Sequence, residues 1–460
     1  VRSSAASDVY KRQTKKRLNS VFGTLQLGYK DMVYLDLTAR NDWSSALAFT
    51  ESMSFFYPSV GATFLLDEMF HMNDDLFDMV KLRASYSVVG NDIPAYYSRP
   101  VATLSKLTIT LPTVMPFTDW KPEKTFSIEA GFDLAMLHNR LRTEFTFYKA
   151  NTKNQYFQVS APVASGYSKR NINAGNVENL GIEASLSYRL DFNHDWSWTP
   201  GINFSYNKNE IKELCPGLEE YNLAEASAFI MKLKKGGSYG DIYTYDFQYD
   251  DNGNIKLDNT GAPLLTSDAD TYAGNFNSKF HLGWSNTINW KNLNIYALVD
   301  GKIGGKVLSM TEAIMDGYGV SKATGDARLN GGVPNKDGSM IDAEKYYSRV
   351  GGRAQNAGFN AMEYMYSATN FRLRELSVGY TFENLFGMNK NLTASVVGRN
   401  LFFLYKKSPC DPDISGSTGN GWQGIDVFSL PATRSWGLNL KLNFCLLYTS
   451  PSPRDGATSR

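Results

Sequence analysis

The stretch that most constrains the fold is Ser435–Phe444, in which apolar and polar residues alternate at every position. One parity carries an aromatic residue at each end with three leucines between them, and the other carries only polar residues and glycine. Successive side chains of a β-strand point to opposite faces of a sheet, so this segment predicts a strand with one fully apolar face. A soluble β-sandwich contains strands of the same kind, and one strand alone leaves both architectures open.

The recurrence of this pattern decides between the two architectures. Long strands that alternate apolar and polar residues, each of roughly ten residues, are typical of a transmembrane β-barrel with lipid outside and an aqueous lumen inside. The strand that begins at Phe371 changes parity near Glu375, which predicts a β-bulge. We therefore expect an all-β, antiparallel transmembrane β-barrel with thirteen spanning strands, near 18–30, 31–41, 54–67, 78–91, 123–137, 139–157, 169–191, 195–214, 278–290, 292–304, 369–382, 391–404 and 432–444.

The connections between these strands alternate between short turns and longer loops rich in Gly, Asn, Asp and aromatic residues. Outer-membrane barrels have short periplasmic turns and long extracellular loops, so the last strand should run from outside to inside. The segment Ser238–Gln248 also resembles a strand, but counting it as spanning would place a long loop on the wrong side. We assign it to an extracellular hairpin with its turn at 251–254, and we expect short helices near 306–317 and 341–350.

Composition excludes several classes of protein. The 47 basic and 46 acidic residues nearly cancel, so no nucleic-acid partner is indicated. Cys215 and Cys410 are too few and too far apart for a disulfide framework or a metal site. No run of 18 apolar residues exists, so no membrane-spanning helix is predicted.

Both ends of the chain have the character of translated sequencing adapter. The hexapeptide at 8–13 back-translates to a nucleotide string whose reverse complement, in a shifted frame, encodes the hexapeptide at 445–450. Such an inverted repeat is expected from ligated adapters, and real disordered tails are the alternative. We expect 1–13 and 445–460 to be adapter and 14–444 to be the C-terminal part of a barrel cut at its start.

The segments that resemble motifs for catalysis or for cofactor binding each lack a residue or a spacing that the motif requires. The segment Asp300–Lys306 resembles a phosphate-binding loop, but Val307 stands where Ser or Thr should bind magnesium. Asp250–Asn254 resembles a calcium loop, but Ile255 occupies the position that requires glycine. The histidines show no metal-ligand spacing and are expected in turns or at rims, at His71, His138, His194 and His281. We expect no catalytic residue, no cofactor, no metal and no enzymatic activity.

Acidic pairs on the strands have two interpretations. Glu144 and Glu183 would suit a glycosidase dyad, but on strands with polar inner faces they are expected to be charges of the lumen. The outward parity makes a further prediction. Charged substitutions at Leu186 or Leu440 should cost roughly 2–4 kcal/mol at mid-membrane.

The aromatic residues divide into two groups. Trp290, Trp436 and Phe444 lie near strand ends, where aromatic girdles meet the membrane interface. Aromatic residues in the long loops have no apolar surroundings that require them, so they are candidates for stacking on sugars or peptide side chains or for contact with a partner. Packing within the loops is the alternative for these residues, which are Tyr96, Tyr97, Trp120, Tyr167 and Trp422.

Eight ordered motifs resemble the barrel of the SusC/RagA family of TonB-dependent outer-membrane transporters of Bacteroidetes. They are LTARNDWSS (37–45), FFYPSVGATFLL (55–66), KLRASYSVVGN (81–91), KPEKTFSIEAGFDL (121–134), NAGNVENLGIEASLSYR (173–189), DGKIGGKV (300–307), FRLRELSVGY (371–380) and VVGRNLF (396–402). The resemblance covers nearly all of 14–444. Barrels of this kind have about 22 strands, so thirteen would leave roughly nine missing.

The resemblance implies import of glycans, peptides or similar nutrients through the outer membrane. It further implies a SusD-like surface lipoprotein as lid and energy from the TonB–ExbB–ExbD complex, reached through an N-terminal part with plug and TonB box that this sequence lacks. One alternative is a passive porin or a barrel-based adhesin. Another is a secreted β-sandwich enzyme acting on carbohydrate, which the strand lengths and the lack of a convergent acid/base pair disfavour.

Overall fold

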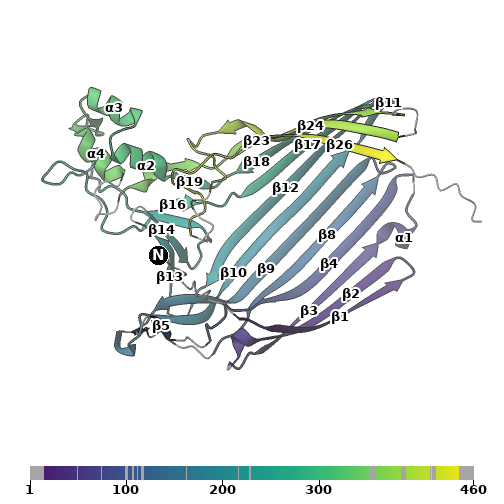
Figure 1. Cartoon of the computed structure of the whole chain (residues 1–460), viewed down its shortest axis with the longest axis horizontal. Helices are drawn as coiled ribbons and strands as arrows, with labels where there is room; N and C mark the ends of the chain where they lie inside the picture. The colour runs from purple at the N-terminus through teal and green to yellow at the C-terminus, as the bar shows by residue number, and fades with distance from the viewer. Residues whose placement is uncertain are drawn as a thin grey trace, which may run out of the picture.

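The structure is a computed structural model that describes residues 15–48, 50–73, 75–98, 102–105, 108–110, 112–115, 119–161, 163–215, 217–226, 229–351, 359–384, 390–414, 416 and 421–444. The two terminal segments assigned to adapter, 1–13 and 445–460, lie outside these ranges. Within them, one curved antiparallel sheet dominates the molecule (Figure 1).

Thirteen long strands follow one another in chain order across this sheet, and each is antiparallel to its neighbours. They confirm the thirteen predicted segments. The strands are β1 (Leu18–Tyr29), β2 (Val33–Ser44), β3 (Ser54–Leu65), β4 (Phe77–Asn91), β8 (Glu123–Met136), β9 (Leu141–Ser160), β10 (Lys169–Tyr188), β12 (Trp196–Glu213), β17 (Phe280–Trp290), β18 (Leu293–Ile303), β23 (Asn370–Phe382), β24 (Lys390–Lys406) and β26 (Ser435–Phe444).

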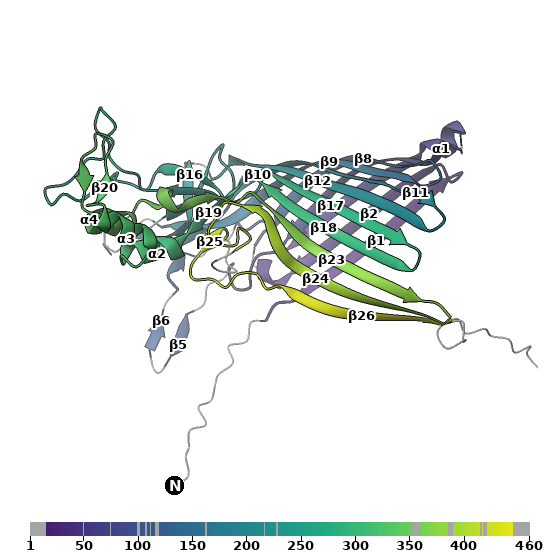
Figure 2. The ribbon, with the colours of Figure 1, turned by 90° about the horizontal axis from the view of Figure 1, so that it is seen from above.

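The sheet curves into a trough whose two edges are β1 and β26 (Figure 2). Short hairpin turns close the strands at one end, here called the turn end. The long connections gather at the other end, here called the loop end (Figure 1). Two short strands extend the sheet, β11 (Leu190–Asn193) beside β12 and β7 (Val114–Met115) beside β10. The predicted alternation of turns and loops is therefore confirmed.

Side-chain alternation along the strands gives the sheet two different faces. On β10, Leu186 is exposed on the outer face, while Glu183 lines the trough together with Glu144 of β9. At the turn end, Trp290 pairs with Trp196 across β17 and β12, and both rings are exposed. This agrees with an aromatic girdle, to which the sequence analysis had not assigned Trp196. Trp436 is exposed as well, whereas the side chain of Phe444 lies outside the described part.

The predicted bulge in β23 is confirmed one residue from the expected position. Leu298 of β18 pairs with Glu375 and Val299 pairs with Leu373, so Arg374 is the extra residue. A bulge re-aims the side chain of the inserted residue. The Arg374 guanidinium reaches Asp300 on the neighbouring strand and Asp413 in the last loop, the latter at 3.3 Å.

The loop end carries a separate packed unit with its own small sheets. Its buried core includes Phe229, Met231, Ile242, Leu308 and Ile425, which come from loops far apart in the chain. The strands of this unit are β13 (Glu220–Glu225), β14 (Phe229–Lys234), β15 (Asp241–Thr244) and β16 (Thr271–Asn275) in one sheet, β19 (Lys306–Ser309), β22 (Met365–Ser367) and β25 (Ile425–Asp426) in another, and β20 (Val333–Pro334) with β21 (Met340–Ile341).

Three α-helices belong to the same unit: α2 (Met310–Gly317), α3 (Lys322–Leu329) and α4 (Ala343–Val350). The expected helix at 306–317 was wrong in its first four residues, which form β19 because they pair with β22 and β25. The Ser309 hydroxyl accepts from the backbone N–H of Glu312 and caps α2, a Ser-x-x-Glu signal that marks this start in the sequence. The helix at 341–350 is confirmed as α4, and α3 was missed.

The remaining elements are short. They are α1 (Leu66–Phe70) after β3, the hairpin of β5 (Thr103–Ser105) and β6 (Thr108–Thr110), and 3-10 helices at Ser45–Leu47, Val163–Ser165 and Ala361–Tyr364. The segment Ser238–Gln248 lies outside the main sheet as predicted, with β15 paired to β14 and β16. Its turn is confirmed by a hydrogen bond from the Asp250 N–H to the Asn254 carbonyl at 2.9 Å.

Acid should loosen the turns of this hairpin. Hydrogen bonds from the Thr260 hydroxyl and from backbone N–H groups lower the pKa of Asp258 to about 2, from an ordinary value of 3.8. Because the folded pKa is the lower one, the stabilisation is complete above pH 4 and is lost as the pH falls towards 2. We expect hydrogen exchange of 250–262 to accelerate over this pH range, after correction for intrinsic rates. Asp258→Asn should remove much of that pH dependence, and an unchanged dependence would contradict the assignment.

Candidate functional site

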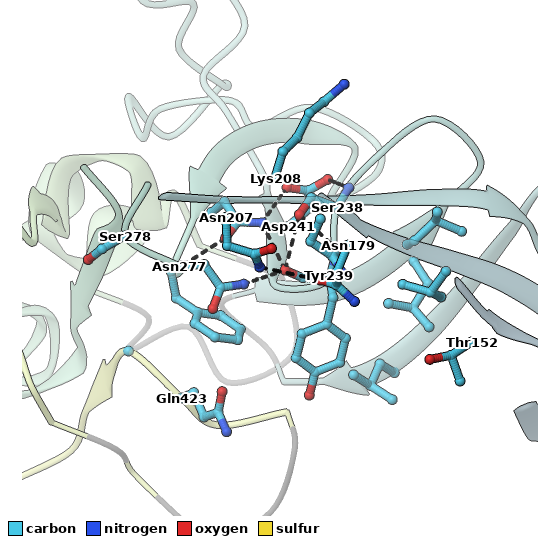
Figure 3. Close-up of a pocket in the computed structure, with 18 of the residues that line it drawn as sticks. Thr152, Asn179, Asn207, Lys208, Ser238, Tyr239, Asp241, Asn277, Ser278 and Gln423 are labelled. Atoms are coloured by element: carbon cyan, nitrogen blue, oxygen red, sulfur yellow. Dashed lines mark hydrogen bonds between the residues drawn. The ribbon is translucent and has the colours of Figure 1, made fainter. Parts of the chain in front are cut away.

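A cavity of about 1320 Å³ opens at the loop end of the trough. Strands β9, β10 and β12 form its wall, and the loops around Tyr239, Asn277, Asp413 and Gln423 surround its mouth (Figure 3). A cavity of this size is larger than the usual pocket for a drug-sized molecule. It is therefore a suitable place to receive an extended ligand.

Two kinds of side chain dominate the lining of this cavity. Amide side chains can donate and accept hydrogen bonds at once, and tyrosines combine an apolar ring with a polar hydroxyl. The amides are Asn91, Gln155, Gln158, Asn179, Asn207, Asn209, Asn275, Asn277 and Gln423. The aromatic residues are Tyr97, Tyr148, Tyr156, Phe157, Tyr206, Tyr221, Tyr239, Tyr272 and Phe276.

Adjacent strands bring three of the amides together. Asn179 of β10 accepts hydrogen bonds from Asn207 at 3.3 Å and from Asn209 at 2.9 Å, both on β12. The Tyr148 hydroxyl of β9 donates to Asn207 at 3.3 Å. These residues occupy the positions of their strands that alternate with the outward-facing ones, so their side chains all lie on the inner face of the sheet. The cluster gives the cavity a wall that is polar without carrying a charge.

The same cluster holds a loop residue in place. The backbone N–H of Tyr239 donates to Asn209 at 2.8 Å. Its carbonyl accepts from Asn275 at 3.0 Å and from Asn277 at 2.7 Å. Figure 3 shows Tyr239 surrounded by this network of hydrogen bonds. Three asparagine side chains from separate segments thus position one aromatic residue at the cavity.

Charged groups at the cavity are largely neutralised within the protein. Lys302 forms an ion pair with Asp413 at 2.6 Å, and Lys208 forms one with Glu210 at 2.9 Å. Burial alone would raise the pKa of Asp413, but the Lys302 ammonium, together with Arg372 and Arg374, outweighs it and lowers that pKa. Asp413 therefore stays ionised at neutral pH and keeps its loop attached to the wall.

The predicted aromatic residues lie in different settings. Tyr97 lines the cavity, with its ring at 5.9 Å from Tyr156 and 6.1 Å from Trp120. Trp120 itself is 0% exposed in a core with Leu47 and Ile93, so it supports Tyr97 from behind. The Trp422 ring packs edge-on against Phe229 at 5.6 Å, beside the cavity residue Gln423.

Of the five candidates, Tyr97 alone lines the cavity; Trp120 and Trp422 pack close to it, and the other two lie apart from it. Tyr96 is exposed on the outside of its loop with a positive φ of 69°, and its hydroxyl accepts from the Lys15 N–H. Tyr167 is half-buried, and its N–H donates to the Ser165 hydroxyl. Neither lines the large cavity. The five residues are therefore not one site, although each remains a candidate contact for a ligand or a partner.

The sequence analysis missed the amide cluster and Tyr239. A signal was present on β12, where Asn203, Asn207 and Asn209 share the inward parity of one strand. No comparable signal identifies Tyr239, because its partners lie 30 and 36–38 residues away in the chain.

Neither a metal-binding cluster nor a membrane-spanning helix occurs in the described residues. They contain no group of three or more His, Cys, Asp or Glu side chains arranged to hold a metal ion. Separately, none of the helices in this part of the chain has the length and apolar character needed to cross a membrane.

A strongly curved antiparallel sheet with short turns at one end, and long loops with a polar cavity at the other, is typical of the wall of a large outer-membrane β-barrel. Residues 2–300 match the family described as TonB dependent receptor-like, beta-barrel, and the chain belongs to that family. Its location is the bacterial outer membrane, and the loop end is the end that the orientation of such barrels places outside.

Relatives and solved structures agree with this membership. The chain is 25% identical to TonB-dependent receptor P3 of Formosa agariphila, over 93% of the chain and 45% of that protein. It is 23% identical to TonB-dependent receptor SusC of Bacteroides thetaiotaomicron, over 94% and 44% respectively. The fold is similar to a chain of the RagAB peptide importer in its open-open state, with a TM-score of 0.74, 21% identity, and coverage of 93% of this chain and 47% of that one. The chain thus spans about half the length of the relatives it matches.

Proposed function

We propose that this chain forms the wall and extracellular loops of a TonB-dependent importer that takes up glycans or other large nutrients. The observation that supports it most is the cavity of about 1320 Å³ at the loop end, lined by amides and tyrosines within a SusC/RagA-type barrel. In this proposal the outer face of the sheet meets lipid, and the inner face lines the path of the nutrient. The protein acts as a transporter, with no catalytic role for its carboxylates.

Two partners belong to the proposal. A SusD-like surface lipoprotein would cover the loop end and close the cavity around a captured nutrient. The TonB–ExbB–ExbD complex would supply energy through the N-terminal part of the receptor. The packed unit at the loop end, with α2, α3 and α4, offers a large surface for the lipoprotein (Figure 1). One similar structure is that of a peptide importer, and the proposal therefore includes peptides among the large nutrients.

A passive porin or a barrel-based adhesin is the alternative function. Both would be built on a similar wall, but neither needs a plug, a TonB box or a lid. Membership of the TonB-dependent receptor family disfavours both.

The intact gene tests the importer proposal directly. Long-read sequencing upstream of Gln13 and downstream of Phe444 should find a plug domain, a TonB box and a neighbouring SusD-like gene. It should also find native codons in place of 1–13 and 445–460. A plugless chain with its own signal peptide would overturn active import and favour the porin or adhesin. Genomic DNA that encodes both terminal hexapeptides would overturn the adapter assignment.

Uptake by cells supplies the functional test. With the intact receptor, disabling the TonB box should abolish uptake of the nutrient while leaving its binding at the cell surface intact. The control is a point substitution elsewhere in the N-terminal extension, which should leave uptake unchanged. Uptake that persists without the TonB box would be passive and would contradict the proposal.

A further inference from the structure

We propose that Tyr239 is a fixed stacking platform for a sugar ring and that the cavity around it selects uncharged oligosaccharides. The inference rests on the proposed import function and names the class of nutrient that this receptor takes. Three observations carry it: the attachment of Tyr239, the amides around it and the neutralised charges.

The attachment of Tyr239 leaves its backbone little freedom. Asn209, Asn275 and Asn277 together bind its N–H and its carbonyl, at 2.7–3.0 Å. These side chains come from β12 and from the segment that ends β16, so the backbone of Tyr239 is held where those elements place them. The loss of conformational freedom on ligand binding is then small, because the loop is ordered before the ligand arrives.

Packing fixes the ring as well. The Tyr239 ring meets the edge of Phe276 with centroids 5.9 Å apart and an interplanar angle of 84°. Phe276 can approach Tyr239 this closely because Tyr239 is followed by Gly240. Gly240 has a φ of +94°, and a Cβ at this position would lie 2.5 Å from the Phe276 ring. Tyr239 remains half-buried and lines the cavity. A rigid, partly exposed aromatic face suits stacking against the C–H face of a pyranose ring.

The neighbouring amides match hydroxyl groups. Each Asn or Gln side chain both donates and accepts, as each sugar hydroxyl does. Asn207, Asn277 and Gln423 line the same cavity as Tyr239 (Figure 3). Asn207 and Asn277 already bond Asn179 and the Tyr239 carbonyl, but an amide has two N–H donors and two oxygen lone pairs, so a sugar hydroxyl can use the positions that these bonds leave over.

The charges argue against an ionic ligand. Lys208 and Lys302 are already paired with Glu210 and Asp413. Asp241 is 6% exposed and accepts from Ser238 and Asn275, both at 2.8 Å. Among the described lining residues, the acids without an ion pair are Glu123, Glu183 and the hydrogen-bonded Asp241, and Lys279 is a lysine without one. An entering carboxylate or sulfate would meet Lys279 together with Glu123 and Glu183, so it would lose water without gaining a net positive environment, which is costly.

The test uses the intact receptor with its lipoprotein, purified in detergent. Calorimetry would compare neutral gluco-, manno- and xylo-oligosaccharides with uronate-containing oligosaccharides and with peptides of similar mass. We expect a neutral oligosaccharide to bind at least tenfold more tightly than the acidic oligosaccharides and the peptides. A preference for a peptide or an acidic oligosaccharide would overturn the inference and leave TonB-dependent import intact. Absence of any TonB-dependent uptake in cells would instead remove the proposed function itself.

Variants test the platform. Tyr239→Ala should weaken binding of the preferred neutral oligosaccharide roughly tenfold or more, as loss of an anchoring aromatic does. Tyr239→Phe keeps the ring and should bind within about threefold of the wild type. Tyr380→Ala, at an exposed tyrosine near the turn end of β23 and outside the cavity, is the matched control and should bind normally. Heat-dependent gel mobility would verify that each variant is folded. Unchanged binding by a folded Tyr239→Ala receptor would overturn the platform.

Discussion

Leu440→Arg is expected to destabilise the barrel by about 2–4 kcal/mol, because it places a charge in lipid near the middle of a spanning strand. Leu440 lies in the centre of β26, 61% exposed, between Leu438 and Leu442 on the same face. On the neighbouring strand β24, the residues that pair with this face are Leu392, Ala394 and Val396, which offer the guanidinium no hydrogen-bond acceptor from their side chains. The measurement is urea unfolding of the intact receptor in lipid vesicles, together with the amount of folded receptor in outer membranes.

The neighbouring residue provides the control. Asn439 pairs in the same ladder but points to the opposite face, so Asn439→Arg should be tolerated within about 1 kcal/mol. A charged substitution at Leu186 should cost less stability than one at Leu440. Leu186 lies two residues from the turn end of β10, and the cost of a charge falls towards the membrane interface. If Leu440→Arg and Asn439→Arg assembled equally well, the assignment of faces would be wrong.

Arg372→Ala should cost about 3–5 kcal/mol, because removal of one partner leaves a buried charge unpaired. The side chains of Arg372 and Asp411 are only 3% and 8% exposed, and they form an ion pair at 2.7 Å. The Arg372 guanidinium also lies over the Phe403 ring, 4.0 Å from its centroid. This pair attaches the last long loop to β23, so its loss should release that loop from the wall.

Protease treatment of intact cells measures the release, with cleavage near Asp411 as the readout. The matched control is Arg399→Ala, which removes an exposed pair with Glu375 at 3.0 Å and should cost no more than about 1 kcal/mol. A double variant, Arg372→Met with Asp411→Leu, should recover much of the stability, because no buried charge remains. Equal protease resistance of Arg372→Ala and Arg399→Ala would show that the buried pair does not attach the loop.

Much of the wall follows from local pattern. Each spanning strand carries its own alternation of apolar and polar residues, so the thirteen strands and their faces are readable one at a time. The bulge at Arg374 is readable for the same reason, since it appears as a change of parity. The structure of the loop-end unit depends instead on pairing between residues far apart in the chain. Residues 306–309 form a strand only because β22 and β25, about 60 and 120 residues further along, lie beside them.

The sequence by itself determined the barrel wall, because a strand between lipid and water alternates apolar and polar residues, and this pattern is visible within a few adjacent residues. Only the tertiary structure decided the site. Trp120 and Tyr97 have the same aromatic character in the sequence, yet one is fully buried and the other lines the cavity. Tyr239 is positioned by Asn209 and by Asn277, which are brought to it by the register of β12 and by the path of a later loop. Such contacts depend on long-range packing, and no local pattern of residues specifies them.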